Sequence, residues 1–363
     1  MAISLLHDVL ALGVQEKASD WHIKENAPIM IRVEGKLVAT DLIPDTQFMT
    51  DLVSQLLDDE QYKVFKRTGD CDLSFVEELV GRFRVNVHQQ RGMMSVNMRH
   101  VKSTIIPLRQ LGVPPILTEI AESHRGIIIM TGTTGSGKST TLAGILQHIN
   151  ETMPKHVITI EDPIEYEFID DKSFFEQREI GIDTESFASA LKHALRQDPD
   201  VIMVGEMRDR ESFESAMQAA DTGHLVISTM HAANATQAVN RILDFYSHEE
   251  KEALRQALSL NLRSIISQRL IPKIGGGVVP ACEVMVNTPL IRSLIEENNL
   301  DKLSQAVEGG EQDGMQSFNK CMLDLFNAGK ITEADALANA TNAGALKMNL
   351  KGIFLNSSGG ITG

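Results

Sequence analysis

One octapeptide constrains this chain more than any other feature, the segment Gly132-Thr133-Thr134-Gly135-Ser136-Gly137-Lys138-Ser139. It satisfies the pattern G-x-x-x-x-G-K-[ST] of phosphate-binding loops. An apolar, strand-like run at 127–130 leads into it, and a helix-forming stretch at 140–150 follows it. That order aims backbone N–H groups and the positive end of a helix dipole at one point, where a polyphosphate group can sit.

The side chains of this loop suit a nucleotide with its metal ion. The glycines let the backbone wrap closely around phosphate oxygens because they carry no Cβ. We expect Lys138 to neutralise the β- and γ-phosphates and the Ser139 hydroxyl to ligate Mg²⁺. Thr140 follows directly and is included in the predicted site. The sequence therefore predicts that the chain binds ATP and Mg²⁺.

The rhythm of the chain predicts the fold around the loop. From about Arg125, apolar runs at 127–130, 157–160, 201–204 and 225–228 alternate with helix-forming stretches. Apolar runs of this kind suit strands covered on both faces, and hence a largely parallel α/β sheet. After Pro289 the pattern becomes helical, with predicted helices at 291–297, 300–307, 318–327 and 333–341.

The first hundred residues have a different character and predict a small α+β domain. They contain a helical pattern at 5–12, a hairpin turning at Glu34-Gly35, and alternating strands at 83–87 and 94–99. The sequence thus predicts five segments: an N-terminal domain at 1–100, a proline-punctuated linker at 101–116, an α/β ATPase core at 117–288, a helical C-terminal region at 289–352, and a flexible tail at 353–363.

Acidic residues at strand ends extend the prediction from binding to hydrolysis. Glu161-Asp162-Pro163-Ile164-Glu165 follows the strand at 157–160, and Gly205-Glu206 follows the strand at 201–204. Open α/β sheets bind ligands at the carboxyl ends of their strands. Either acid alone could be a merely solvated side chain. On strands that we expect to flank the phosphate loop, one carboxylate would polarise the attacking water and Glu206 would hold Mg²⁺ through water.

Two histidines, His224 and His231, bracket the predicted strand at 225–230. A spacing of seven is not a usual metal-ligand pattern. Two readings remain open: structural histidines, or groups that sense the γ-phosphate and carry its state to the next subunit.

Composition excludes several classes of function. The net charge of -15 argues against non-specific nucleic-acid binding, because such binding needs Lys and Arg to replace phosphate counterions. Cys71, Cys282 and Cys321 are far apart in sequence, so we expect reduced, apolar cysteines. No apolar run approaches the roughly 20 residues of a membrane span, and the N-terminus lacks a signal-peptide pattern. We therefore predict a cytoplasmic protein.

The motifs together resemble the PilT/PilU retraction ATPases of the type II/IV secretion ATPase superfamily. The resemblance covers almost the whole chain and rests on segments 18–22, 81–86, 132–141, 160–166, 195–209 and 222–231. It implies a RecA-like core, a PAS-like N-terminal domain and a homohexameric ring. It also implies a motor that retracts type IV pili at an inner-membrane platform protein, to which the ring binds peripherally.

Site residues carried over by the resemblance include the two acids and the histidine pair. Glu165 matches the catalytic glutamate, Glu206 the Walker-B acid, and His224 and His231 the family's His box. The resemblance also implies that arginines of the N-terminal domain, here Arg84 and Arg99, reach the phosphates when the ring closes.

Departures from the family pattern bear on the direction of work. Extension-type relatives carry a four-cysteine zinc site that this chain, with three cysteines, lacks, and this favours retraction. Asn287-Thr288-Pro289-Leu290-Ile291 is similar to the PilU branch, whereas Ala18-Ser19-Asp20 is similar to the PilT branch. Two alternatives stay open: an accessory ATPase that docks on a paralogous retraction ATPase, and a pilus-extension or protein-export motor.

Overall fold

A computed structural model describes residues 2–101, 103–355 and 361–362. The chain divides into two compact units. The first contains Met1–Thr104 together with Pro163–Glu167, and the second contains Ile105–Asp162 and Phe168–Gly363. The predicted linker is split by this division, since Leu108 is buried in the core of the second unit beside helix α5 (Lys138–Thr152).

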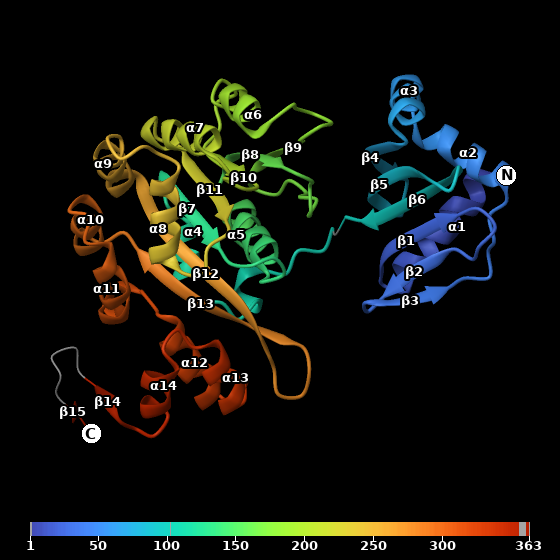
Figure 1. Ribbon diagram of the computed structural model, residues 1–363. Helices are drawn as coiled ribbons and strands as arrows, with labels where there is room; N and C mark the ends of the chain where they lie inside the picture. Colours follow the sequence, from blue (N-terminus) through green and yellow to red (C-terminus); the bar gives the residue numbers. More distant parts are fainter. Residues whose placement is uncertain (1, 102, 356–360, 363) are drawn as a thin grey trace. The chain divides into compact units, whose positions relative to one another are not determined.

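The first unit is built on a six-stranded antiparallel sheet with the order β3-β2-β1-β6-β5-β4 (Figure 1). Its strands are β1 Ala18–Lys24, β2 Met30–Val33, β3 Lys36–Ala39, β4 Asp70–Glu77, β5 Gly81–Gln90 and β6 Met93–His100. Its helices are α1 Ala2–Gln15, α2 Thr46–Leu56 and α3 Asp59–Thr68. The predicted hairpin is confirmed: Glu34 and Gly35 have φ of 48° and 81°, the two positive values that a tight hairpin turn requires.

One face of this sheet packs against the three helices around Trp21, the chain's only tryptophan. Trp21 is fully buried, packs edge-on against Phe83 at 5.4 Å, and donates its indole N–H to the carbonyl of Val9 at 3.2 Å. Gly13 of α1 lies against the indole, where an added Cβ would stand 2.4 Å from the ring. Helix α1 therefore docks through a contact that only glycine permits.

The second unit is built on a seven-stranded sheet with the order β13-β12-β7-β11-β10-β8-β9. Neighbouring strands are parallel except β12 and β13, which form an antiparallel pair. The strands are β7 Gly126–Thr131, β8 His156–Glu161, β9 Phe174–Glu179, β10 Val201–Val204, β11 Leu225–Met230, β12 Leu262–Pro272 and β13 Val278–Val286.

Helices cover both faces of this sheet, as the apolar strands predict. Ile127 and Ile129 of β7 pack into a core shared with α6 to α11, whereas Ile128 and Met130 pack against α4 and α5. The helices are α4 Ile116–Ala121, α5 Lys138–Thr152, α6 Phe187–Ala194, α7 Arg210–Asp221, α8 Ala235–Asp244, α9 Lys251–Asn261, α10 Pro289–Glu296 and α11 Leu303–Gly309. Short 3-10 turns span Leu108–Gln110, Leu300–Lys302 and Glu311–Asp313.

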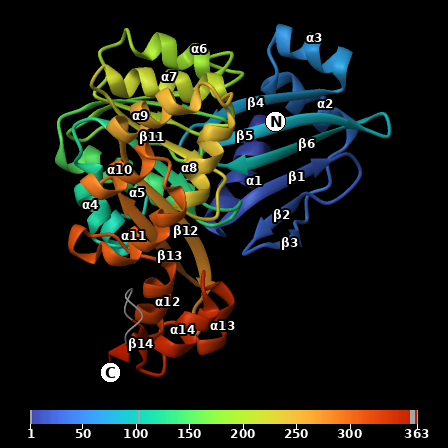
Figure 2. The same cartoon turned by 60° about the vertical axis from the view of Figure 1, so that its left-hand side comes forward.

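The C-terminal region is helical, as predicted. Helices α12 Phe318–Asn327, α13 Glu333–Asn339 and α14 Ala343–Asn349 gather at the far end of the β12–β13 hairpin, away from α6 and α7 (Figure 2). In the predicted tail, strands β14 Phe354–Leu355 and β15 Ile361–Thr362 pair antiparallel, and residues 356–360 and 363 lie outside the described part. Within that described part, no helix combines the length and apolar character needed to cross a membrane.

The strand order corrects one expectation. The strands that end in acids do not flank β7, because its neighbours are β11 and β12. Strand β11 pairs with β7 along its whole length and with β10 on its other side, so it separates the loop-bearing strand from the acids. Strands β8 and β10 are adjacent to each other, as expected. An apolar pattern predicts that a strand is buried on both faces, but it contains no information on lateral order.

Candidate functional site

The octapeptide at 132–139 forms the turn between β7 and α5, as predicted. Gly132, Gly135 and Gly137 have φ of 151°, 78° and 83°, values that favour glycine over any residue with a Cβ. Gly137 is the N-cap of α5, and no side chain caps the helix. Helix α5 thus begins at the loop, and the N–H groups of its first turn lie at the helix end next to it.

The exposed arch of the loop is Thr133, Thr134 and Gly135, and Ser136 turns back into the protein. Lys138 reaches across the arch: its ammonium donates to the carbonyls of Gly132 at 2.8 Å and Thr133 at 3.0 Å. These contacts hold the cation over the loop. Ser139 and Thr140 are half-buried in the first turn of α5.

A buried glutamine on β12, which the sequence reading missed, fixes the loop from beneath. Gln268 is 2% exposed. Its amide nitrogen donates to the carbonyl of Ser136 at 2.9 Å, and its amide oxygen accepts from the hydroxyl of Thr141 at 2.8 Å. One side chain therefore holds the last turn of the loop and the first turn of α5 in a fixed relation.

The same glutamine explains why two loop positions are glycine. A Cβ on Gly132 would stand 2.6 Å from the carbonyl oxygen of Gln268 and 2.5 Å from the hydroxyl of Ser136. A Cβ on Gly137 would stand 2.8 Å from the amide nitrogen of Gln268. The only sequence signal for this contact was a polar residue in an otherwise apolar stretch, because the pairing of β12 with β7 is a long-range feature.

Glu206 and His231 are brought together by the structure. Glu206 follows β10 and His231 follows β11, and His231 Nε2 lies 3.3 Å from Glu206 Oε1. The other carboxylate oxygen of Glu206 accepts from Arg208 Nε at 2.8 Å. This hydrogen bond is the main reason why the pKa of the Arg208 guanidinium is raised. The Glu206 carboxylate, whose side chain is only 18% exposed, is thus held between two nitrogen groups.

Backbone contacts set the position of Glu206. Gly205 N–H donates to the carbonyl of Ile160 on β8 at 2.8 Å, and the Thr229 hydroxyl of β11 donates to the carbonyl of Gly205 at 2.7 Å. Met207 N–H then donates to the carbonyl of Thr229 at 3.0 Å. The peptide groups on both sides of Glu206 are therefore tied to neighbouring strands.

His224 precedes β11 and His231 follows it, so the two histidines lie at opposite ends of this strand. The carbonyl of His224 accepts from the N–H of Gly126, the first residue of β7. The six residues of β11 separate the two histidines by about 20 Å. His224 Nδ1 lies 2.9 Å from the carbonyl oxygen of Ala219, so its ring is fixed on α7 rather than at the phosphate loop of its own chain.

Glu165 is exposed and belongs to the segment 163–167, which groups with the first unit rather than with the seven-stranded sheet. Strand β8 runs to Glu161, one residue further than predicted, so this acid is part of the strand. Glu161 is 7% exposed. Its carboxylate accepts from the Thr159 hydroxyl at 2.7 Å and from the Gln177 amide nitrogen at 3.2 Å.

Arg84 and Arg99 lie opposite each other on β5 and β6 of the first unit. Arg99 Nε donates to Asp20 Oδ1 at 2.7 Å. Burial on its own would raise the pKa of Asp20, but hydrogen bonds from Ser19 and Arg99 outweigh burial, so that the pKa is lowered. Both arginines are exposed on the face of the sheet that the helices leave open.

The residue after Gln268 connects β12 to the C-terminal helices. The Arg269 guanidinium lies 3.8 Å from the ring centroid of Phe318, and it donates to the carbonyls of Asn339 at 2.5 Å and Ala233 at 3.4 Å. Ala233 lies in the loop that follows His231. Successive residues of one strand therefore contact the phosphate loop and the C-terminal helices.

The chain is similar to known proteins over most of its length. PilT of Pseudomonas aeruginosa, a type IV pilus retraction ATPase, is 40% identical over 334 residues, which cover 92% of this chain and 97% of that protein. The type IV pilus ATPase PilU of the same organism is 37% identical over 345 residues, covering 94% and 90%. A crystal structure of the pilus retraction motor PilT with bound ADP matches with a TM-score of 0.86 at 40% identity, covering 93% of this chain and 97% of that one.

The family itself is matched along nearly the whole chain. Residues 1–347 match the family described as type II/IV secretion system protein. The relatives extend over both units, so the likeness is not confined to the phosphate loop. This chain belongs to the type II/IV secretion system protein family and, within it, to the PilT and PilU group of ATPases.

Proposed function

We propose that the chain is an ATP-hydrolysing motor that powers the retraction of type IV pili. The observation that carries the proposal is the loop at 132–139, whose three glycines, bridging Lys138 and uncapped helix α5 suit a nucleotide polyphosphate. The likeness to PilT, along 92% of this chain, supplies the kind of work.

The residues of the loop would divide the binding of ATP between them. The backbone N–H groups from Gly132 to Thr140 would surround the phosphates, and Lys138 would exchange its carbonyl partners for phosphate oxygens. Glu206 would lie beside the reacting phosphate, because Thr229 and Ile160 hydrogen-bond the preceding Gly205. His231 would contact its carboxylate. Glu165 would polarise the attacking water, as the family resemblance implies.

Mg²⁺ suits the donor set, since a serine hydroxyl and a carboxylate are the oxygen ligands that this ion prefers. Ser139 would ligate it directly. Both oxygens of Glu206 already have nitrogen partners, which fits contact with the ion through water. Bound Mg²⁺ would neutralise charge on the β- and γ-phosphates.

The assembly is also a proposal. We infer a homohexamer in which the PAS-like domain at 1–100 brings Arg84 and Arg99 to the phosphates and the RecA-like core at 117–288 hydrolyses ATP. His224, at the amino end of β11 and away from the loop, would then act on a neighbouring subunit. The ring would work in the cytoplasm on an inner-membrane pilus platform protein, and we propose no nucleic-acid partner.

Two measurements test the proposal. The purified protein should hydrolyse ATP, and Lys138→Ala should abolish hydrolysis while leaving the melting temperature unchanged. A deletion strain should carry abundant surface pili that do not retract. A strain without pili would instead indicate extension, and a protein that binds ATP without hydrolysing it would contradict the motor.

A second candidate is an accessory ATPase that assists a principal retraction ATPase. The similarity to PilU and the segment 287–291 favour it. In a strain with an intact paralogue, a Lys138→Ala copy would then still support retraction, whereas a principal motor would lose it.

A further inference from the structure

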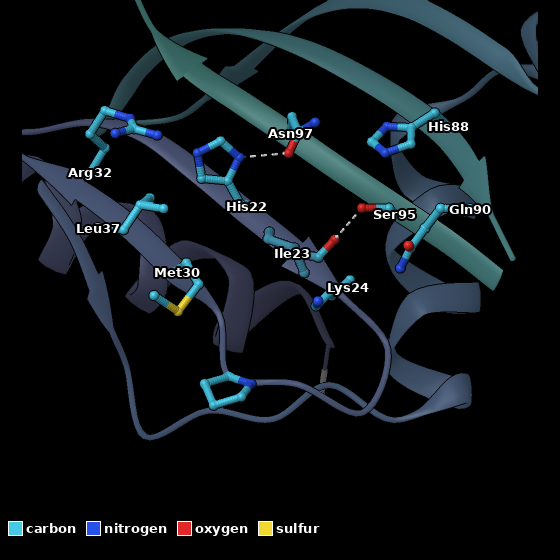
Figure 3. A pocket seen from close by; sticks show the side chains of 11 residues that line it. His22, Ile23, Lys24, Met30, Arg32, Leu37, His88, Gln90, Ser95 and Asn97 are labelled. Atoms are coloured by element: carbon cyan, nitrogen blue, oxygen red, sulfur yellow. Dashed lines mark hydrogen bonds between the residues drawn. The ribbon is translucent and has the colours of Figure 1, made fainter. Parts of the chain in front are cut away.

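The open face of the six-stranded sheet contains a cavity that the proposed function does not use. It has a volume of about 300 Å³ and lies over β1, β2, β5 and β6 (Figure 3). This size is at the lower end of the range for sites that bind small molecules. Its lining residues are His22, Ile23, Lys24, Pro28, Met30, Arg32, Leu37, His88, Gln90, Ser95 and Asn97.

Strand alternation explains why polar groups gather here. Trp21 of β1 and Ile31 of β2 point into the core, so the residue that follows each of them, His22 and Arg32, points to the open face. Register places His22 beside Asn97, and Lys24 beside Ser95. Apart from Pro28, which lies between β1 and β2, the lining thus comes from neighbouring strands of one sheet.

The lining is cationic in a chain of net charge -15. It contains Lys24 and Arg32 but no Asp or Glu. Arg32 is steadied by a hydrogen bond to the carbonyl of Gly35 at 3.0 Å, and Asp20 lies 3.9 Å from its Nε. Lys24 is exposed, and its side chain makes no hydrogen bond or ion pair with any residue that the structure describes. Two cations at the rim of a small cavity suit an anion.

His22 adds a specific polar atom. Its Nδ1 lies 2.8 Å from Asn97 Oδ1 (Figure 3). Because an amide oxygen can only accept, Nδ1 donates the hydrogen of this bond, and Nε2 faces away from Asn97. That Nε2 atom is buried and has no hydrogen-bond partner within the described residues. A buried polar atom of this kind is costly unless a polar ligand group reaches it, and a hydroxyl, which can donate or accept, suits it.

We propose that this cavity binds a small hydroxylated organic anion, held by the charges of Lys24 and Arg32, which lie at opposite ends of the lining, with a hydroxyl at His22 Nε2 between them. Met30, Leu37 and Pro28 give the ligand an apolar surface to rest on. All residues of the cavity belong to the first unit, whereas the loop at 132–139 belongs to the second.

Isothermal titration calorimetry on the full chain tests the proposal. The chain carries Lys138→Ala so that the phosphate loop contributes little, and the probes are ribose 5-phosphate, citrate and inorganic phosphate. We expect saturable binding of ribose 5-phosphate or citrate, weakened about tenfold or more by Lys24→Ala and by Arg32→Ala. Ribose 5-phosphate alone would indicate a phosphate ligand, and citrate alone a carboxylate ligand.

Lys36→Ala is the matched control, because Lys36 is exposed on β3 and outside the lining. It removes the same charge and should change affinity less than twofold. If Arg32→Ala fails to fold, Lys24→Ala decides the test, since Lys24 supports no other group. The proposal is overturned if neither organic anion saturates, if Lys36→Ala weakens binding as much as Lys24→Ala, or if inorganic phosphate binds as tightly as ribose 5-phosphate.

Discussion

His231 Nε2 lies 3.3 Å from Glu206 Oε1, and this contact joins the ends of two neighbouring parallel strands. Arg208 holds the second oxygen of the same carboxylate. The acid at the end of β10 is therefore fixed in direction as well as in position. A displacement of His231 at the end of β11 would therefore change the position of the Glu206 carboxylate without any movement of the phosphate loop.

Replacing the acid by its isostere should separate hydrolysis from binding. Glu206→Gln keeps the shape of the side chain but removes its charge, so we expect a loss of turnover of about 10²-fold or more. The dissociation constant for ATP should change little, because Lys138 and the loop backbone remain. Steady-state hydrolysis and equilibrium nucleotide binding measure the two effects. Equal losses in both would show that Glu206 supports the fold of the loop instead.

His224 and His231 form a matched pair, since they lie at opposite ends of strand β11. His231→Gln should reduce turnover by roughly tenfold, because it replaces the imidazole that steadies the Glu206 carboxylate with a more flexible amide side chain. His224→Gln should leave binding of nucleotide to a monomeric preparation unchanged. Combining His231→Gln with Glu206→Gln should add little further loss. Additive losses in this double-mutant cycle would contradict the contact.

Gln268 should matter to the nucleotide although it is buried beneath the loop. Gln268→Leu leaves the carbonyl of Ser136 and the hydroxyl of Thr141 without their partner, at a cost of about 1–3 kcal/mol in the free energy of unfolding. We expect the KM for ATP to rise, since the loop loses its fixed relation to α5. Thr141→Val removes only one of the two bonds and should have the smaller effect on both quantities. A variant that loses stability with an unchanged KM would limit Gln268 to a structural role.

Gly13 offers a test of the first unit that Trp21 reports directly. Gly13→Ala would bring a Cβ within 2.4 Å of the indole, so we expect destabilisation of about 1–3 kcal/mol from overpacking. Since Trp21 is the only tryptophan, its fluorescence follows the unfolding of this unit in urea. Gly35→Ala, where an added Cβ meets nothing within 4 Å, tests the cost of a positive φ without a clash.

Asp20 should make the first unit sensitive to acid. Its pKa is lowered from 3.8 in the folded protein, so its contribution to stability is present above that value and is lost as the pH falls through the folded pKa. Asp20→Asn should therefore cost about 1–2 kcal/mol at pH 7, and the difference from wild type should shrink below about pH 4. Urea melts followed by Trp21 fluorescence at pH 7 and pH 3 measure it. A difference that does not depend on pH would rule out the charge of Asp20 as the cause.

Local signals predicted much of the fold. The hairpin at Glu34-Gly35, the turn between β7 and α5, and helix α12 are each encoded within a few neighbouring residues, and each appears where the sequence places it. Strands β12 and β13 were not predicted as separate elements. Ser264, Ser267 and Gln268 interrupt the apolar pattern of β12, although burial accommodates them through hydrogen bonds.

The site was predicted by motif but not by arrangement. Glu206 and His231 meet because β11 pairs with β10, and Gln268 meets Ser136 because β12 pairs with β7. Both are long-range pairings that no residue pattern specifies. The family resemblance groups His224 with His231, although β11 places them at its opposite ends.

Strand β12 presents Gln268 to the phosphate loop and Arg269 to the C-terminal helices. Since adjacent side chains of a strand share one stiff backbone, a displacement of the loop cannot be absorbed between these two residues. The strand thus contacts the nucleotide-binding loop through one residue and the C-terminal helices through the next. Variants at the base of α12, far from the nucleotide, should in consequence alter how tightly ATP is held, and the binding energy of ATP should be detectable as a change in the stability of those helices.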